Sequence, residues 1–299
     1  MCVKNRYKLL LSYILSFTLF FAAPLFGGNV SSASDACSAA SNAVSMPEYV
    51  YVCGAPIGMR LKSDGLVVTG YTAFLSENEE YVNPAKKAGI MVGDRIVSVN
   101  GTKIKSAEDL AAELISSAGG ECRALVERSG ETKELVFYPE REIASSEYKI
   151  GVWIKDCSAG IGTITFYDKE SGFFGALGHG INDSATHGLF PASGGSAFSA
   201  VISGVRKGYS GIPGELKGYF RDDCGCLGSI SVNGENGVYG VLTDEACELF
   251  GGRKVPVDRE GVIHPGEATI ISTVDGCNAA EYKIEIEHVD TEEKGNKGI

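Results

Sequence analysis

A single histidine inside a glycine-rich turn is the feature of this sequence best suited to catalysis. His179 lies within Gly175–Asp183 (GALGHGIND), and the apolar, glycine-punctuated run Gly160–Asp168 precedes it. Imidazole titrates near neutral pH, so a side chain presented in this way can take a proton from a hydroxyl and return it to a leaving amine. We therefore predict that His179 is the general base of a hydrolase.

The serine that such a base would activate is not evident downstream of it. Ser196 and Ser210 lie in glycine-rich segments, but neither completes a Gly-x-Ser-x-Gly elbow. Glycine-flanked serine is common in turns, so we expect neither residue to be the nucleophile. Asp183 follows the histidine closely and is expected to be a turn residue and not the acid of a triad.

No metal site or cofactor is predicted. His179, Asp183 and His187 are spaced four residues apart and would share one face of a helix, but the glycines around them disfavour a helix there. His264 and His288 are isolated in the sequence.

Local signals in residues 47–140 predict several short elements. Pro84–Ala88 predicts a helical turn that Gly89 ends, and Asn100–Gly101 predicts a hairpin turn after a strand. A second hairpin is predicted across Ser129–Gly130. Between the two hairpins, Ser106 and Asp109 form a capping box for a helix. The predicted buried face of this helix is Ala107, Leu110, Ala111, Leu114 and Ile115.

Residues Pro84–Gly101, followed by the helix that begins at Ser106, resemble a bacterial PDZ domain, which we assign to residues 47–140 as an α+β domain. A PDZ domain binds a peptide as an added strand, with a glycine-containing loop around the terminal carboxylate. The resemblance implies that this loop is Pro56–Met59. The implied peptide-binding residues are Ile57, Gly58, Met59 and Leu61.

Residues 141–299 have short apolar segments between glycine-rich turns and almost no helical period, which indicates an all-β barrel or sandwich. The predicted strands are Lys149–Ile154, Thr163–Tyr167, Ser199–Val205, Val238–Thr243, Glu267–Val274 and Glu281–Val289.

The order of a PDZ domain, the segment Gly151–Asp156, the run Ala159–Asp168 and the turn with His179 resembles the SpoIVB (stage IV sporulation protein B) peptidase family. The resemblance implies a serine peptidase with a trypsin-like double β-barrel and a His–Asp–Ser triad, in which His179 is the histidine. The family's aspartate and its serine, in a Gly-x-Ser-Gly-Ser-Pro motif, would lie beyond residue 299. We therefore expect the peptidase domain at 141–299 to be truncated and inactive as it stands.

Two functions follow from this resemblance. The first is a SpoIVB-type serine endopeptidase in sporulation signalling, which activates the processing of a late mother-cell sigma factor. Its partners would be protein or peptide substrates, including a membrane-protein target and, through the PDZ groove, its own tail. The second is a non-catalytic PDZ module that binds peptides or regulates another protein.

The N-terminus predicts export. Lys4, Arg6 and Lys8 precede the apolar stretch Leu9–Phe26, so residues 1–33 read equally as a signal peptide or as a membrane anchor. Residues 34–46 read as a linker, and the chain after them is expected outside the cytoplasm, secreted or anchored to the membrane.

The net charge argues against nucleic acid as a partner, and the cysteine content allows disulfide bonds. The net charge is -11 without a basic stripe in the folded part, so nucleic acid is not an expected partner. Of the nine cysteines, the eight after Cys2 are enough for up to four disulfides, whose pairing the spacing does not fix.

Overall fold

The structure is a computed structural model that describes residues 47–209, 214–221, 225–258 and 263–289. The predicted signal or anchor segment and the linker after it lie outside the described residues. Within the described part of the chain, no helix is long and apolar enough to cross a membrane. Most of the described residues form strands, and their buried side chains fall into two hydrophobic clusters.

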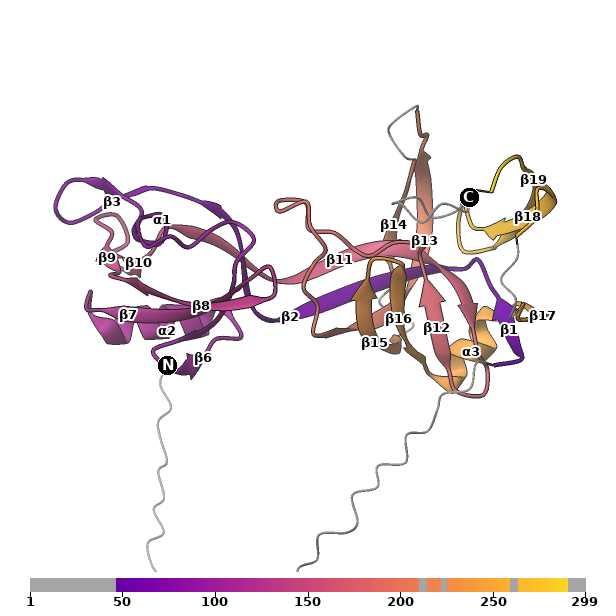
Figure 1. Cartoon of the computed structure of the whole chain (residues 1–299), viewed down its shortest axis with the longest axis horizontal. Coiled ribbons are helices and arrows are strands. Elements are labelled where there is room, and N and C mark those ends of the chain that lie inside the picture. Colours follow the sequence, from indigo (N-terminus) through magenta and orange to yellow (C-terminus); the bar gives the residue numbers. More distant parts are fainter. Residues whose placement is uncertain (1–46, 210–213, 222–224, 259–262, 290–299) are drawn as a thin grey trace, which may run out of the picture. The chain divides into compact units, whose positions relative to one another are not determined.

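The first cluster fills a closed antiparallel barrel (Figure 1). The ring consists of β2 (Pro56–Tyr71), β13 (Gly194–Arg206), β15 (Cys226–Gly234), β16 (Gly237–Leu242), β12 (Phe173–Ala176) and β11 (Val152–Tyr167), and β11 closes it by pairing with β2. Ile57, Met59 and Leu61 on β2 are fully buried inside it, together with Phe174 on β12. Closure of the ring gives each of the six strands a hydrogen-bonded neighbour on both sides, which stabilises the barrel.

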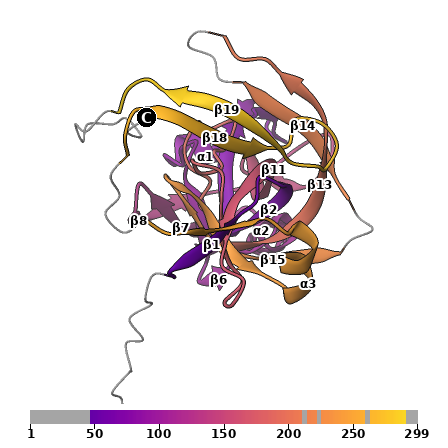
Figure 2. The same cartoon turned by 90° about the vertical axis from the view of Figure 1, so that its right-hand side faces the viewer.

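Further elements surround the barrel. β1 (Tyr49–Val52) pairs with β11 and with β17 (Arg253–Pro256), and β14 (Glu215–Phe220) pairs with β13. Strands β18 (Gly266–Ser272) and β19 (Ala280–Ile286) form a separate two-stranded ribbon (Figure 2).

Helix α3 (Asp244–Phe250) was not predicted from the sequence. At seven residues it is too short to show a clear 3.6-residue period. Thr243 caps its N-terminus, and the Tyr167 hydroxyl donates to the carbonyl of Gly251 at the C-terminal end of the helix and lies 3.1 Å from that of Cys247. Burial in this position raises the pKa of Tyr167 to about 12.

The second cluster contains the residues that resemble a PDZ domain. Its sheet consists of the second half of β2, β5 (Arg95–Val99), β7 (Cys122–Arg128) and β8 (Glu131–Phe137), and helix α2 (Ala107–Ser117) supplies further buried side chains. The remaining short elements are β3 (Phe74–Leu75), β4 (Tyr81–Val82), α1 (Pro84–Lys87), β6 (Thr102–Lys103), β9 (Glu140–Arg141) and β10 (Tyr148–Lys149).

Most local predictions in this region are confirmed. Ser106 and Asp109 form the predicted capping box, and Asn100 and Gly101 both have positive φ, 51° and 82°, as a type I′ turn requires. The predicted buried face of the helix is wrong in part. Leu110 and Leu114 are buried, but Ala107, Ala111 and Ile115 are exposed because only the 110/114 row of side chains enters the cluster.

β2 and β11 contribute to both clusters. On β2, Ile57–Leu61 belongs to the barrel, whereas Leu66 and Val68 belong to the second cluster. On β11, Val152 and Ile154 pack on the second cluster, whereas Ile164 and Tyr167 lie in the barrel. The PDZ region is thus inserted between two adjacent strands of the barrel, and the start of the predicted 47–140 domain packs with the barrel.

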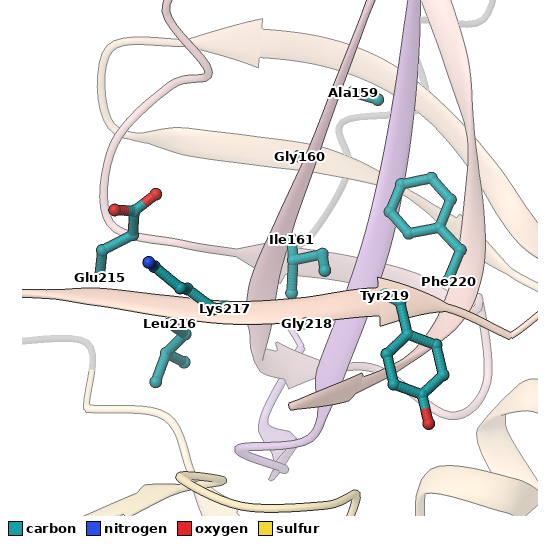
Figure 3. A pocket seen from close by; sticks show the side chains of 9 residues that line it. All are labelled: Ala159, Gly160, Ile161, Glu215, Leu216, Lys217, Gly218, Tyr219 and Phe220. Carbon is teal, nitrogen blue, oxygen red and sulfur yellow. The ribbon is translucent and has the colours of Figure 1, made fainter. Parts of the chain in front are cut away.

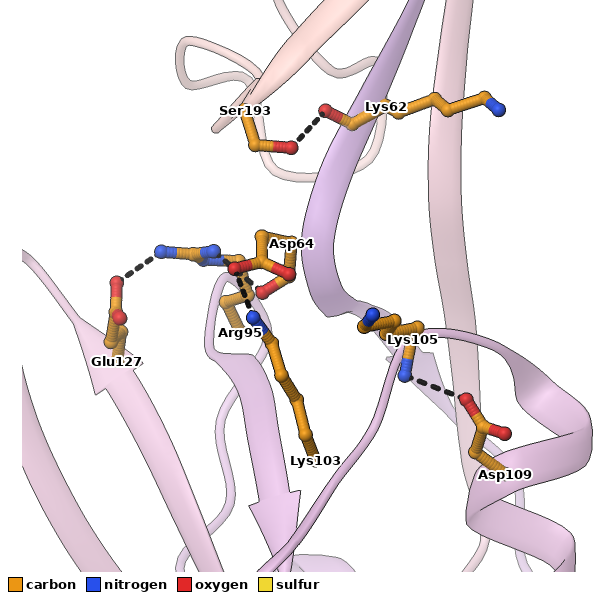
Figure 4. A network of polar contacts seen from close by, with 8 residues as sticks. All are labelled: Lys62, Asp64, Arg95, Lys103, Lys105, Asp109, Glu127 and Ser193. Atoms are coloured by element: carbon orange, nitrogen blue, oxygen red, sulfur yellow. Dashed lines mark hydrogen bonds and ion pairs between the residues drawn. The ribbon is translucent and has the colours of Figure 1, made fainter.

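The physical reason for this difference is that β2 runs on through Asp64–Gly65, with a shift of its register against β11 between Lys62 and Val67, and does not form a hairpin there. Polar contacts hold β2 where it leaves the barrel (Figure 4). The Lys62 carbonyl accepts from Ser193, and the Asp64 carboxylate lies 2.7 Å from Lys103 Nζ. Arg95 donates to the Asp64 carbonyl at 2.7 Å. The hydrogen bond from Lys103 lowers the pKa of Asp64.

Candidate active site

His179 lies on a short turn that follows β12. His179 is exposed, whereas Ala176 before it and Gly180 after it are buried. Leu177 has a positive φ of 61°, which is costly for a branched side chain. Two contacts with β11 hold it there: its N–H donates to Thr163 O at 3.0 Å, and its carbonyl accepts from Thr165 Oγ1 at 3.3 Å. The turn therefore starts from a strained and fixed backbone.

The imidazole contacts the backbone of the next residue. His179 Nδ1 lies 2.9 Å from the carbonyl oxygen of Gly180. Because a carbonyl oxygen only accepts hydrogen bonds, this contact requires the proton on Nδ1. Nε2 then carries the lone pair, which is the arrangement that a general base needs.

The chain after His179 is held by Asn233, at the end of β15. Its side chain accepts a hydrogen bond from Ile181 N at 2.8 Å and donates to the carbonyls of Ile181 and Phe190 at 3.0 and 2.9 Å. Gly180 is buried against this site, since a Cβ there would lie 2.5 Å from Gly234 O and 2.2 Å from Leu189 Cδ1. Only glycine fits at position 180 without movement of its neighbours.

Asp183 anchors the second half of the same loop. Its carboxylate is 1% exposed, lies 2.8 Å from Lys155 Nζ on β11, and accepts from the backbone N–H groups of Ala185 and Thr186 at 3.0 Å. Burial alone would raise the pKa of Asp183. The hydrogen bonds from Lys155 and from the two N–H groups outweigh that effect, so the pKa lies below its ordinary value. Asp183 is thus a structural anion of the loop, with its oxygen atoms already engaged.

The predicted peptide-binding residues lie elsewhere than expected. Ile57, Gly58, Met59 and Leu61 are inside β2 and not in a loop, and they pair with β11 on one side and β13 on the other. Their apolar side chains are fully buried. A peptide cannot add as a strand here because both edges of β2 are occupied, so the loop interpretation of Pro56–Met59 does not fit the structure.

An open groove of about 480 Å³ lies between β11 and β14 (Figure 3). Ile161, Leu216 and Phe220 give it an apolar lining, and Glu215 and Lys217 add charges of opposite sign. His179 does not line this groove, so we do not assign the groove to the active site.

Comparisons with known proteins identify two families. A family model for the SpoIVB peptidase S55 matches residues 146–299, which is over half of the chain, and a PDZ domain model matches residues 83–128.

The chain belongs to the SpoIVB peptidase S55 family.

The chain is also similar to a protein of Lactococcus lactis subsp. lactis (strain IL1403) named "Putative zinc metalloprotease LL2128". The two are 34% identical over 91 residues, which is 30% of this chain and 19% of that protein. The chain thus spans about a fifth of the length of this relative, whose name describes that protein alone. Among the described residues of the S55 chain, no group of three or more His, Cys, Asp or Glu is placed to hold a metal ion.

The family match confirms the predicted peptidase with a PDZ domain and the mostly-β architecture, but the in-chain serines remain poor candidates. Ser196 lies inside β13 and not in a turn, with Arg60 and Ser229 opposite it on the two neighbouring strands. Ser210 lies outside the described residues. Both His264 and His288 are exposed, and neither belongs to the loop of His179.

None of the six described cysteines of the S55 chain forms a disulfide. They are Cys53, Cys122, Cys157, Cys226, Cys247 and Cys277. Cys53 and Cys247 are buried in the barrel cluster, and burial raises the pKa of both thiols. The predicted disulfides are therefore not formed among these six residues.

Sequence reasoning missed the two side chains that hold the loop of His179. Asn233 is 52 residues away from Ile181, and Lys155 is 28 residues away from Asp183. The sequence Asn233–Gly237 indicates a turn, but no local sequence pattern indicates that the side-chain amide of Asn233 binds another loop.

Proposed function

We propose that this chain acts as a serine-type endopeptidase of the S55 family with His179 as its general base. The observation that carries the proposal is the geometry of the imidazole. Its Nδ1 is bound to the Gly180 carbonyl at 2.9 Å while the ring stays exposed, which leaves Nε2 available to a hydroxyl. A serine oxygen would attack the scissile carbonyl, and His179 would transfer its proton to the leaving amine.

The physiological substrate that we propose is a protein outside the cytoplasm, in the signalling between compartments during sporulation. Two observations support this role: membership of the S55 family and the basic and apolar N-terminal segment, Lys4 to Phe26, that is typical of export. In this role the chain would be secreted or anchored to the membrane, and its substrate would include a membrane protein.

We further propose that the PDZ region binds a peptide beside the first residues of β11. Residues 67–71 of β2 pair with β11, and Leu66 and Val67 pair with β5, so β2 offers no open edge there. Within the described residues, no strand pairs with the opposite edge of Val152–Lys155. Helix α2 contacts β10, which leads directly into this segment.

The exposed face of α2 supports this position. Ala107, Ala111 and Ile115 recur every fourth residue and form an apolar row, and Ile115 is 61% exposed. We propose that this row and the open edge of β11 together grip a peptide through its side chains and its backbone. Peptides with a free C-terminal carboxylate, selected from a random library, should lose binding after Ile115→Asp. Ile143→Asp, at another exposed isoleucine, should leave binding unchanged, and equal binding by all three proteins would refute this site.

A second candidate function is a non-catalytic peptide-binding module. It is favoured by the position of Ser196, which lies inside β13 between Arg60 and Ser229 and is not presented in a turn as a nucleophile.

A serine-directed fluorophosphonate probe separates the two functions. The full gene product should be labelled at one serine, which mass spectrometry of the labelled peptide locates. His179→Ala should slow labelling by roughly 10³-fold or more, since the oxyanion site and binding alone remain. His187→Ala, an exposed histidine of the same loop, is the matched control. Absence of labelling in the folded protein would support the binding module.

A further inference from the structure

The contact between Asn233 and the loop of His179 involves one particular peptide group. The N–H of Ile181 and the carbonyl of Gly180 belong to the same planar peptide unit. Asn233 Oδ1 accepts from that N–H at 2.8 Å, and the carbonyl of the unit accepts from His179 Nδ1 at 2.9 Å. Asn233 and His179 are therefore joined through two hydrogen bonds and one rigid peptide plane.

The other bonds of Asn233 make this plane difficult to rotate. Its side-chain nitrogen donates to the carbonyls of Ile181 and Phe190, so the amide has its oxygen and both N–H groups engaged. The N–H of Phe190 also donates to Ile181 O at 2.9 Å. A rotation of the plane would break the bond to Asn233 and would press Gly180 against Leu189 and Gly234.

We propose that Asn233 is a positioning residue for His179, which acts through the Gly180–Ile181 peptide to hold the proton on Nδ1 and keep Nε2 as the basic nitrogen. This inference rests on the proposed role of His179 as a base. Hydrogen bonds in series polarise one another, so the bond that Asn233 accepts from Ile181 N–H makes the Gly180 carbonyl a better acceptor. The Nδ1–H tautomer that this contact favours is the one in which a triad histidine acts as a base.

The remaining anchors of the loop do not replace this contact. The Lys155–Asp183 pair fixes the chain after Asn182, and the bonds of Leu177 fix the chain before Gly178. Neither contact involves the peptide unit that accepts from the imidazole. Loss of Asn233 should therefore leave the loop attached at both ends but allow the Gly180–Ile181 plane to turn.

The test is the tautomer of His179, measured by ¹⁵N NMR on the full chain with ¹⁵N-labelled histidine. With four histidines in the sequence, the signal is assigned by its loss in His179→Gln. The unaltered protein should show Nδ1 protonated and Nε2 unprotonated above the histidine pKa. Asn233→Ala should move the signal toward the tautomer mixture of free imidazole and increase amide exchange at Ile181 roughly tenfold.

Asn233→Asp distinguishes positioning from general support of the loop. The carboxylate still accepts from Ile181 N–H but no longer donates to Ile181 O and Phe190 O. The Nδ1–H tautomer should therefore persist, although exchange at Phe190 increases. Asn236→Ala, on the same hairpin turn and exposed, should change neither quantity.

An unchanged tautomer in folded Asn233→Ala would overturn the inference, and so would loss of the Nδ1–H tautomer in Asn233→Asp. If Asn233→Ala does not fold, the Asp variant decides alone. The NMR signals of His179 do not depend on a serine nucleophile. The outcome of this test is therefore independent of the fluorophosphonate labelling that tests the peptidase function.

Discussion

Lys155 and Asp183 form an ion pair whose carboxylate is almost completely buried, with 2.8 Å between Lys155 Nζ and Asp183 Oδ2. Lys155 is part of β11 at the point where this strand pairs with the PDZ region, opposite Val67. Asp183 lies four residues after the candidate base. The pair thus connects the strand shared by both hydrophobic clusters with the loop of His179.

Removal of the cation should destabilise the protein because it leaves a buried negative charge without its partner. We expect Lys155→Met to lower the free energy of unfolding by about 2 kcal/mol or more, measured by urea denaturation. Lys169→Met, which breaks the exposed pair with Glu248, should cost no more than about 0.5 kcal/mol. If the two substitutions lowered the free energy of unfolding equally, the buried pair would contribute no more stability than the exposed pair.

The lowered pKa of Asp183 gives a defined pH dependence. A carboxyl whose pKa in the folded state is depressed stabilises the protein above its ordinary pKa of about 4, and this contribution is lost as the pH falls through the lower native value. Asp183→Asn should therefore reduce stability at pH 7, and its difference from the unaltered protein should shrink below about pH 4. Denaturation midpoints at pH 7, 5 and 3 measure this. If the difference in stability between Asp183→Asn and the unaltered protein did not change with pH, the lowered pKa of Asp183 would be contradicted.

Gly180 should tolerate no side chain. A Cβ at this position would lie 2.2 Å from Leu189 Cδ1 and 2.5 Å from the Gly234 carbonyl oxygen, so Gly180→Ala must displace the loop or the β15–β16 hairpin. We expect a loss of roughly 1–3 kcal/mol in stability, together with slower fluorophosphonate labelling. Gly188→Ala, in the same loop, meets only Thr186 Oγ1 at 3.9 Å and should be close to neutral in both measurements.

Met59 tests whether the start of the predicted PDZ domain belongs to the barrel. Its side chain is fully buried in the barrel cluster, so Met59→Ala should cost about 2–5 kcal/mol of stability. Peptide binding by the folded variant should be unchanged, since the proposed peptide site is beside β11. Met91→Ala, at a methionine that is 52% exposed, should change stability by no more than about 0.5 kcal/mol. Weaker peptide binding without a loss of stability would restore the original interpretation of this segment.

Short-range features of the fold were predictable because their causes are local. The capping box at Ser106 and the Asn100–Gly101 turn depend on residues within three positions of each other, and both are present. The path of β2 was not predictable, because Asp64–Gly65 has the composition of a turn. Its course as one strand depends on pairing with β11 at Lys62 and Val67, on either side of this dipeptide, and on the contacts of Asp64 with Lys103 and Arg95.

The candidate site likewise combines a feature that the local sequence predicts with contacts that depend on distant residues. The glycine-rich turn marked His179 as a base, but the groups that hold the imidazole come from a backbone carbonyl and from an asparagine on another hairpin. Neither contact leaves a pattern in the sequence. The burial of Asp183 was also invisible, because a solvated turn aspartate and one neutralised by Lys155 have the same local sequence.

The insertion between β2 and β11 has a mechanical consequence. β2 enters the PDZ region and β11 leaves it, and the two strands are hydrogen-bonded neighbours in the barrel. A change in the path of either strand within the PDZ region would therefore act on two adjacent strands of the barrel. Both connections between the PDZ region and the barrel are therefore strands that are hydrogen-bonded to each other, and neither is a loop.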